Sequence, residues 1–263
     1  MGRGRTQRFL VTRIVDGVAR RNPDELVVEE PLEIRLDGHR VSTTMRTPGN
    51  DFELAVGFLH AEGVLNDAPV TTIRYCGTGS AAATEFNVVT VETGGVAPVP
   101  PERAGTTTSS CGWCGSDAID ALCDRLILLT SDTPSIALPV LERVAEMVRP
   151  AQDLFSSTGA VHAAAAFDTQ GQLVCVREDI GRHNAVDKVV GRLLLDARLP
   201  AAGLGLFVSG RASFEMVQKA WAAGFSTLVA VSAPSALAVE TARRAGLMLV
   251  GFARPGRLNV YAP

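Results

Sequence analysis

The sequence predicts an α/β fold in which a smaller β-rich N-terminal part precedes a larger α/β domain. Toward the C-terminus, strand-like and helical segments alternate regularly, which is typical of βαβ units and a parallel sheet. Toward the N-terminus, short β-branched runs are broken by turn residues, as in a set of short strands. We therefore expect a β-rich part with a mobile linker over residues 1–110 and an α/β domain over residues 111–263.

The N-terminal part should consist mainly of strands. The predicted strands are Phe9–Val15, Leu26–Val28, Leu32–Leu36, Val41–Arg46, Ile73–Cys76 and Glu85–Glu92. One helix is expected between them, beginning at Asn50 or Asp51, because either side chain can cap a helix N-terminus. The segment Gly94–Ser110 is rich in Gly, Pro, Thr and Ser and lacks apolar periodicity, so it is predicted to be the mobile linker.

The second part should alternate between strands and helices. Helices are expected over Asp117–Leu129, Leu138–Val148 and His183–Leu195, with a hairpin formed by Val161–Phe167 and Leu173–Val176. The regular alternation that follows is strand Leu204–Val208, helix Phe214–Ala223, strand Thr227–Val231, helix Ser235–Ala245 and strand Met248–Phe252. Gly224 and Gly246 follow the last two helices, where glycine commonly ends a helix.

Composition excludes several classes of protein. The chain has 263 residues, 46% of them hydrophobic and 20% charged, which is typical of a protein with a full apolar core. A net charge of −3 gives no general attraction for nucleic acid or acidic membranes. No apolar run approaches the roughly 18 residues of a membrane span, and Met1–Arg8 lacks the apolar stretch of a signal peptide. We expect a cytoplasmic protein with neither nucleic acid nor membrane as partner.

Two of the five cysteines stand in a reactive pattern. Cys111 and Cys114 form a Cys-x-x-Cys pair within Ser110–Gly115, which could bind metal, cycle as a disulfide or handle sulfur. A helix N-terminus close to the pair would favour the thiolate. No second Cys/His pair with ligand spacing follows, so no metal site is predicted. The other cysteines are expected to be buried core residues: Cys76, Cys123 and Cys175.

Basic side chains mark a candidate phosphate site. The run Arg177–Lys188 joins a predicted strand to a predicted helix, and a helix N-terminus with cationic neighbours binds phosphate well. Two glycine- and arginine-containing loops follow later strands. The alternative interpretation is a capped helix with a solvated charged face and two ordinary turns. The predicted ligand-binding residues are Arg182, His183, Asn184, Lys188, Ser209, Gly210, Arg211, Phe252, Ala253, Arg254, Pro255, Gly256 and Arg257.

The chain resembles the formate dehydrogenase accessory sulfurtransferases, the FdhD family, over nearly its whole length. The segment Glu178–Lys188 (EDIGRHNAVDK) carries the resemblance most specifically. The other matching segments are Arg46–Leu65, Ser110–Gly115 (SCGWCG), Ser157–Ala163, Val208–Glu215 and Met248–Arg257.

The resemblance implies a function and partners. It implies a cytoplasmic sulfurtransferase, a homodimer with a cytidine-deaminase-like α/β fold, that accepts sulfur from a cysteine desulfurase. The sulfur would pass to the molybdenum bis-guanine-dinucleotide cofactor before this cofactor enters formate dehydrogenase. The family's persulfide cysteine corresponds to Cys111, and the segment lining its nucleotide pocket corresponds to Phe252–Arg257. GDP-like nucleotides would then also occupy the site, with Glu178 or Asp179 as the acceptor for the guanine donors.

Two alternatives stay open from the sequence. A zinc-dependent nucleoside or base deaminase fits His60-Ala61-Glu62 followed by the Cys111–Cys114 pair. Against it, Ser110 replaces the proline of that signature, and the Gly/Pro/Thr-rich linker would hold the cysteines poorly at a metal. A non-catalytic chaperone that only holds the cofactor would need the pocket but not the cysteines.

Overall fold

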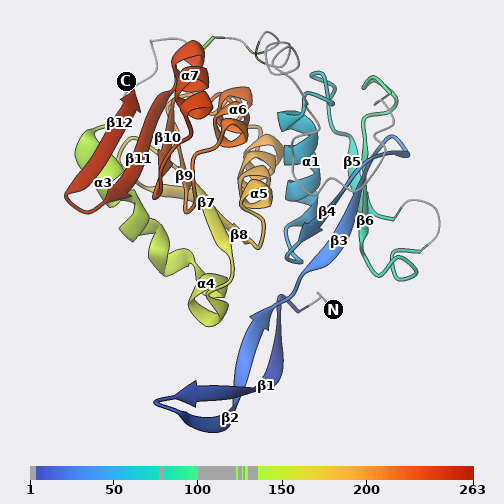
Figure 1. The fold of residues 1–263 in the computed structure, drawn as a ribbon. Coiled ribbons are helices and arrows are strands. Elements are labelled where there is room, and N and C mark those ends of the chain that lie inside the picture. Colours follow the sequence, from blue (N-terminus) through green and yellow to red (C-terminus); the bar gives the residue numbers. More distant parts are fainter. Residues whose placement is uncertain (1–3, 77–79, 100–122, 124–125, 127, 130–135) are drawn as a thin grey trace.

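The computed structural model describes residues 4–76, 80–99, 123, 126, 128–129 and 136–263. Within them lie a two-stranded, a four-stranded and a six-stranded sheet, arranged as a projecting hairpin, a small β-rich unit and a larger α/β unit (Figure 1). The predicted α/β class with a smaller β-rich N-terminal part is confirmed. The predicted division at residue 110, most of the linker and most of the helix Asp117–Leu129 lie outside the described residues.

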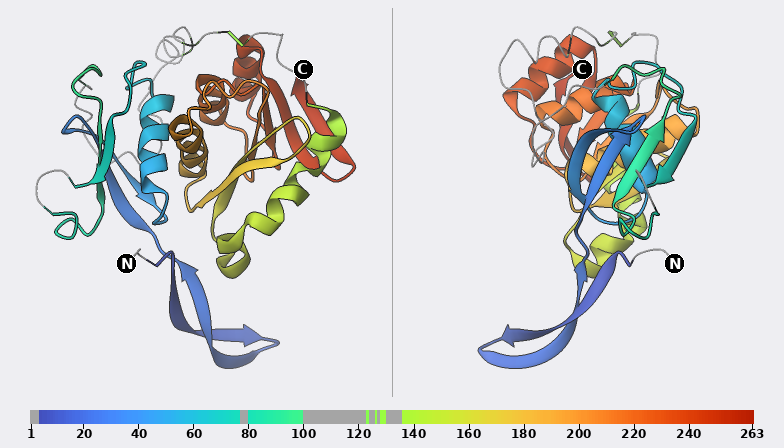
Figure 2. Two further views of the ribbon diagram at one scale, coloured as in Figure 1. Left: turned by 180° about the vertical axis from the view of Figure 1, so that it is seen from behind. Right: turned by 90° about the vertical axis from the view of Figure 1, so that its right-hand side faces the viewer.

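The first two strands form a hairpin that stands away from the body. β1 (Thr6–Val15) pairs antiparallel with β2 (Val18–Val27). The turn residues Asp16 and Gly17 have φ values of 49° and 77°, as a two-residue type I′ turn requires. The sequence predicted β1 but only the end of β2, because residues 18–25 are highly charged and include a proline. Figure 2 shows the hairpin projecting in both views.

The small unit is a four-stranded sheet with one helix on it. β3 (Glu30–Leu36) pairs antiparallel with β4 (His39–Arg46) and parallel with β6 (Val88–Glu92), which also pairs with β5 (Thr72–Tyr75). Alternate residues Leu32, Ile34 and Leu36 are buried, so one face of the sheet is apolar. Helix α1 (Asp51–Ala61) covers that face and contributes to the same core. The predicted strands and helix of this unit are confirmed, except that β6 begins at Val88 and not at Glu85, and that the Asn50 side chain makes no capping hydrogen bond to α1.

The large unit is built on the six-stranded sheet, in the order β12-β11-β10-β9-β7-β8. Its central strands β9 (Gly205–Val208), β10 (Thr227–Ala230) and β11 (Met248–Arg254) are parallel. β7 (His162–Phe167) and β8 (Leu173–Asp179) form the predicted hairpin, antiparallel to β9. The alternation predicted from the sequence is therefore confirmed.

Helices cover both faces of this sheet. Apolar residues of α5 (Arg182–Leu195), α6 (Phe214–Ala222) and α7 (Ala236–Ala245) share one core cluster with the sheet, whereas α3 (Leu138–Val148) packs in another. Neighbouring residues of β7 alternate between the two clusters, so the clusters lie on opposite faces. The 3-10 helix η1 (Arg149–Ala151) and the short helix α4 (Asp153–Thr158) connect α3 to β7. No described helix is long and apolar enough to cross a membrane.

The C-terminal end of the sheet differs from the prediction. The sequence ended the last strand at Phe252 and predicted a loop over Phe252–Arg257. That prediction was wrong: β11 continues to Arg254, and the antiparallel strand β12 (Arg257–Ala262) follows the turn at Pro255–Gly256. The segment is the tip of a β-hairpin.

Two glycines bring the two units into backbone contact. A Cβ atom on Gly57 of α1 would lie 1.8 Å from the carbonyl oxygen of Asp187, and one on Gly191 of α5 would lie 1.8 Å from that of Glu53. Only glycine allows so close an approach of two helices. The α1–α5 crossing, visible in Figures 1 and 2, therefore places the connection from β4 to α1 against the N-terminus of α5.

Candidate functional site

The candidate site lies at one edge of the six-stranded sheet, by which we mean the end at which its parallel strands terminate and not an outer strand. The parallel strands β9, β10 and β11 end there, and the antiparallel pairings His162↔Asp179 and Ala164↔Val208 place the start of β7 and the end of β8 at the same edge. Open α/β sheets bind ligands outside the carboxyl ends of their parallel strands. The edge therefore combines residues from segments distant in the sequence.

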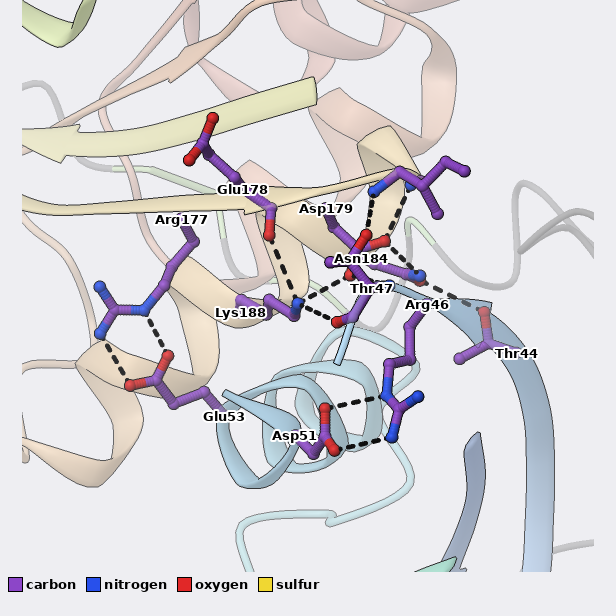
Figure 3. A network of polar contacts seen from close by, with 12 residues as sticks. Thr44, Arg46, Thr47, Asp51, Glu53, Arg177, Glu178, Asp179, Asn184 and Lys188 are labelled. Atoms are coloured by element: carbon purple, nitrogen blue, oxygen red, sulfur yellow. Dashed lines mark hydrogen bonds and ion pairs between the residues drawn. The ribbon is translucent and has the colours of Figure 1, made fainter. Parts of the chain in front are cut away.

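A buried carboxylate organises the start of α5 (Figure 3). The Asp179 side chain accepts hydrogen bonds from the backbone N–H of Gly181 at 2.8 Å and of Thr47 at 3.1 Å, and from the amide of Asn184 at 3.0 Å. It also pairs with the Lys188 ammonium at 2.7 Å. Four donors around one buried carboxylate fix the turn between β8 and α5 and join it to the segment after β4.

Lys188 and Asn184 were predicted to contact the ligand. Lys188 is fully buried, and its ammonium also donates to the carbonyl oxygen of Thr47 at 3.0 Å. Burial lowers the pKa of Lys188, an effect that the neighbouring Asp179 opposes. The Asn184 amide donates to the carbonyl of Met45 at 2.7 Å as well as to Asp179. Both side chains therefore hold the turn between β8 and α5 to the segment after β4 from inside, and their contact with a ligand stays a prediction.

Neither carboxylate predicted to contact guanine is free. Glu178 is buried and accepts from the backbone N–H groups of Leu154 at 2.9 Å and Phe155 at 2.8 Å, so it satisfies the first turn of α4. Asp179 is surrounded by the donors described above. Both carboxylates therefore support the structure of the edge, and the expectation that one of them reads the base is corrected.

Arg182 and His183, the other two predicted residues of α5, lie at the same edge but outside the network around Asp179. The His183 Nε2 atom lies 3.0 Å from a carboxylate oxygen of Glu215, which also accepts from the Ser213 hydroxyl at 2.9 Å. The hydrogen bond with His183 is the main cause that lowers the pKa of Glu215 to about 2. The Arg182 Nε atom is buried and has no hydrogen-bond partner among the described residues, so this arginine has donor capacity left for a ligand.

His162, at the start of β7, lies close enough to Arg182 and His183 to interact with their charges. Burial lowers its pKa, and the charges of Arg182 and His183 lower it further. A Cβ atom on Gly210 would lie 3.5 Å from His162 Nδ1 and 3.8 Å from Arg182 Cδ, so the loop after β9 closes over both. His162 and Glu215 were not predicted as site residues, although both stand in segments that carry the family resemblance.

A cavity of about 630 Å³ opens at the same edge, on the side of α3. Its walls combine apolar and polar groups from α3, α4 and the strand ends, among them Glu146, Arg149, Phe155, His162, Phe207 and Ser209. The Arg149 guanidinium carbon lies 4.5 Å from the centre of the Phe155 ring. Such mixed walls are typical of small-molecule sites. Of the predicted binding residues, Ser209 lines this cavity; Arg211, two residues further on, is exposed.

The hairpin tip forms a second group of predicted residues. Arg254 and Arg257 are exposed on either side of the turn, and Phe252 has a φ of 54° within a bulged part of β11. A positive φ in a bulky residue is strained and recurs at functional positions. Three strand spacings separate β7 from β11, roughly 14 Å. The structure thus divides the predicted residues into two groups along one edge.

The cysteines are only partly described. Cys111 and Cys114 lie outside the described residues, so their predicted roles stay predictions. Cys123 and Cys175 are buried, as predicted, while Cys76 is only half-buried. His60, the histidine of the deaminase alternative, has its Nε2 atom 3.1 Å from the carbonyl oxygen of Ala222, and burial lowers its pKa. The described residues contain no group of three His, Cys, Asp or Glu side chains that could hold a metal ion.

The hydrogen bond between His183 and Glu215 predicts that the stability of the fold falls in acid. Because the folded-state pKa of Glu215 is about 2, below its ordinary value of 4.5, its contribution to stability is present above pH 4.5 and is lost as the pH falls toward 2. Urea unfolding at a series of pH values should show that Glu215→Gln removes part of this acid-dependent loss. Glu240→Gln, which changes an exposed carboxylate on α7, is the control. Equal acid dependence in the wild type and Glu215→Gln would contradict the assignment.

Comparison with known proteins identifies the family. The sequence model of the FdhD/NarQ family matches residues 27–263. The chain is 51% identical to the sulfur carrier protein FdhD of Streptomyces avermitilis over 98% of this chain and 94% of the relative. It is 47% identical to that of Mycobacterium tuberculosis over 91% and 90%. A solved formate dehydrogenase accessory protein from Desulfotalea psychrophila has the same fold, with a TM-score of 0.77, 23% identity and coverage of 99% and 98%. The chain belongs to the FdhD/NarQ family.

Proposed function

We propose that this chain is a sulfur carrier that receives persulfide sulfur on Cys111 and passes it to the molybdenum bis-guanine-dinucleotide cofactor of a formate dehydrogenase. The observation that carries the proposal is the identity of 51% to a relative named sulfur carrier protein, across nearly the whole chain, together with the Cys111-x-x-Cys114 pair. The deaminase alternative is less favoured, because Ser110 replaces the proline that precedes the first cysteine in the deaminase signature.

The first chemical step needs only one thiolate. The Cys111 thiolate would attack the outer sulfur of a persulfide on a cysteine desulfurase, and the bond between the two donor sulfurs would break. Cys111 then carries the persulfide, and the donor cysteine leaves as a thiolate. Only a thiolate is nucleophilic enough for this attack. Intact mass of the full chain after incubation with a desulfurase and cysteine should rise by one sulfur, and an unchanged mass would contradict the proposal.

The sheet edge is the proposed receiving site. Arg182 has an unpaired buried donor, and charge-assisted bonds from arginine to phosphate are strong and specific. The Arg149–Phe155 pair offers a surface for a planar base, and Glu146 is the carboxylate that lines the cavity. An extended dinucleotide could reach along the edge toward Arg254 and Arg257 at the hairpin tip. The proposal also includes a cytoplasmic location and a homodimer.

Guanine nucleotides should bind this edge better than adenine nucleotides. Guanine presents two N–H donors to a carboxylate, whereas adenine presents an acceptor at the corresponding ring nitrogen. We expect Arg257→Ala to weaken GDP binding about tenfold or more, because a charge-assisted bond contributes roughly 1.5–3 kcal/mol. Calorimetry would measure both nucleotides, with Arg40→Ala on the small sheet as the control. Equal affinity for GDP and ADP would contradict guanine recognition.

A further inference from the structure

A buried side-chain amide at the cavity is left without a hydrogen-bond partner. Gln152 lies between η1 and α4, is only 6% exposed and lines the cavity beside α3. Its side chain makes no capping hydrogen bond to α4, and it has no other hydrogen-bond partner among the described residues. A buried polar group without a partner is costly and is rare in folded proteins. The amide, which can both donate and accept, is therefore available to a ligand.

The fold leaves this amide free because another residue satisfies the start of α4. Gln152 holds the N-cap position of that helix, from which a side chain can accept from the second or third helical N–H. Those two N–H groups, of Leu154 and Phe155, donate instead to the Glu178 carboxylate at 2.9 and 2.8 Å. Glu178 reaches them from β8, so the Gln152 side chain is not needed by its own helix.

Two further polar side chains of the cavity keep hydrogen-bonding capacity. The Ser209 hydroxyl oxygen accepts from the N–H of Ala163 at 2.9 Å, so its own hydrogen remains for a ligand. The His162 ring has no hydrogen-bond partner in the described part of the chain. Burial and the charges of Arg182 and His183 lower the pKa of His162, so the neutral ring offers one donor and one acceptor at neutral pH.

The cavity lies between the two groups of basic residues along the edge. On one side, His162 lines the cavity and interacts with the charge of Arg182. On the other side, the wall includes Val231, which follows β10, and the next strand is β11 with Arg254. Phe207 adds a second apolar wall. A planar ring held in the cavity would therefore have a cation within the length of a nucleotide on either side.

We propose that Gln152 is a ligand-binding residue and that its amide reads the edge of a 2-aminopyrimidin-4-one ring. Such a ring presents a carbonyl oxygen beside a ring N–H, and these match the N–H and the oxygen of the amide. The Glu146 carboxylate, which lines the same cavity, is the acceptor for the 2-amino group. Guanine and the pterin of the proposed cofactor both contain this ring. The inference thus rests on the proposed function and deepens it.

Gln152→Met tests the inference, because methionine keeps the length of the side chain and removes both of its polar atoms. The amide makes no hydrogen bond within the described fold, so urea unfolding should show unchanged or raised stability. Calorimetry on the full chain should show GDP binding about tenfold weaker, because two hydrogen bonds to the ring are lost. Gln170→Met, which changes an exposed glutamine between β7 and β8, is the control and should alter neither measurement.

A parallel titration with pterin distinguishes the two halves of the cofactor. Weaker binding of GDP alone would assign the cavity to guanine, and weaker binding of pterin alone would assign it to the pterin. The inference is overturned if Gln152→Met binds both compounds as the wild type does, or if the wild type binds neither. It is also overturned if Gln152→Met unfolds more readily than the wild type, since the amide would then support the fold. Sulfur loading of Cys111 is measured separately by mass, so failure of sulfur transfer would be distinguishable from failure of this inference.

Discussion

Replacing Cys111 with alanine is expected to abolish both sulfur loading and formate dehydrogenase activation. The acceptor of a persulfide must be a thiolate, and the first cysteine of a dithiol motif at a helix N-terminus is usually the more exposed and more acidic. The measurements are intact mass after incubation with a cysteine desulfurase and cysteine, and formate oxidation by the client enzyme matured with the variant. Neither the mass gain nor activation should remain with Cys111→Ala.

Cys114→Ala is expected to separate loading from delivery. The Cys114 thiolate can attack the inner sulfur of the Cys111 persulfide, so that the S–S bond breaks, the terminal sulfur leaves as sulfide to the acceptor, and a Cys111–Cys114 disulfide remains for cellular thiols to reduce. The variant should therefore gain one sulfur but activate the enzyme more slowly. The control is Cys123→Ala, because this cysteine is buried in the core and should affect neither measurement. Sulfur loading on Cys114 with normal activation in Cys111→Ala would contradict the assigned roles.

The cysteine variants also distinguish the sulfur carrier from a chaperone that only holds the cofactor. A chaperone would keep the pocket and would activate the client with both cysteines replaced. The nucleotide measurement is independent of this outcome, since neither cysteine is among the residues to which nucleotide binding is assigned. Loss of activation in Cys111→Ala with normal GDP binding would therefore point specifically to sulfur transfer.

The fold was largely predictable because its elements carry local signals. Alternation of β-branched strands with helices ended by glycine predicted β9 to β11 and the helices between them. Residues 18–25 of β2 were missed because their charged side chains and Pro23 resemble a loop, and the pairing of this strand depends on the type I′ turn at Asp16–Gly17. β12 was missed although Leu258, Val260 and Ala262 stand at alternate positions, because the strand has only six residues and is mostly exposed.

The site was predictable in its location but not in the roles of its residues. A dense charged segment has the same appearance in sequence whether its side chains face solvent or a buried network. Lys188 is buried because Thr47, a partner 141 residues away, meets it, and this meeting depends on the α1–α5 crossing at Gly57 and Gly191. The cavity likewise depends on α3 and α4, which carry no recognisable binding motif.

The buried pair of Lys188 and Asp179 predicts the second large effect. Both side chains are fully buried, and their charged atoms lie 2.7 Å apart. Lys188→Met keeps most of the apolar stem but leaves the carboxylate without its cation. Removing one partner of a buried pair typically costs about 3–5 kcal/mol, so the free energy of unfolding should fall by that order. Urea unfolding with an unchanged m-value would measure the loss.

A surface ion pair on the same helix provides the matched control. Arg192 is half-exposed and lies 2.7 Å from Asp196, and solvent screens exposed ion pairs so strongly that they contribute little to stability. Arg192→Met should therefore be mild. A loss for Lys188→Met no larger than for Arg192→Met would show that the buried pair does not hold the structure together.

A double variant separates the missing cation from other effects of the substitution. Asp179→Asn combined with Lys188→Met removes both charges, while one amide oxygen can still accept from Gly181 or Thr47. Replacing both partners of a buried ion pair lowers the free energy of unfolding less than removing one partner and leaving the other charge unpaired. The double variant should therefore be more stable than Lys188→Met alone. Because Asp179 also accepts from the N–H of Gly181, next to Arg182, Lys188→Met should weaken GDP binding, and the double variant should recover part of this binding. If the double variant recovered stability but not GDP binding, the charges of Lys188 and Asp179 would contribute to the nucleotide site in addition to the shape of the turn between β8 and α5.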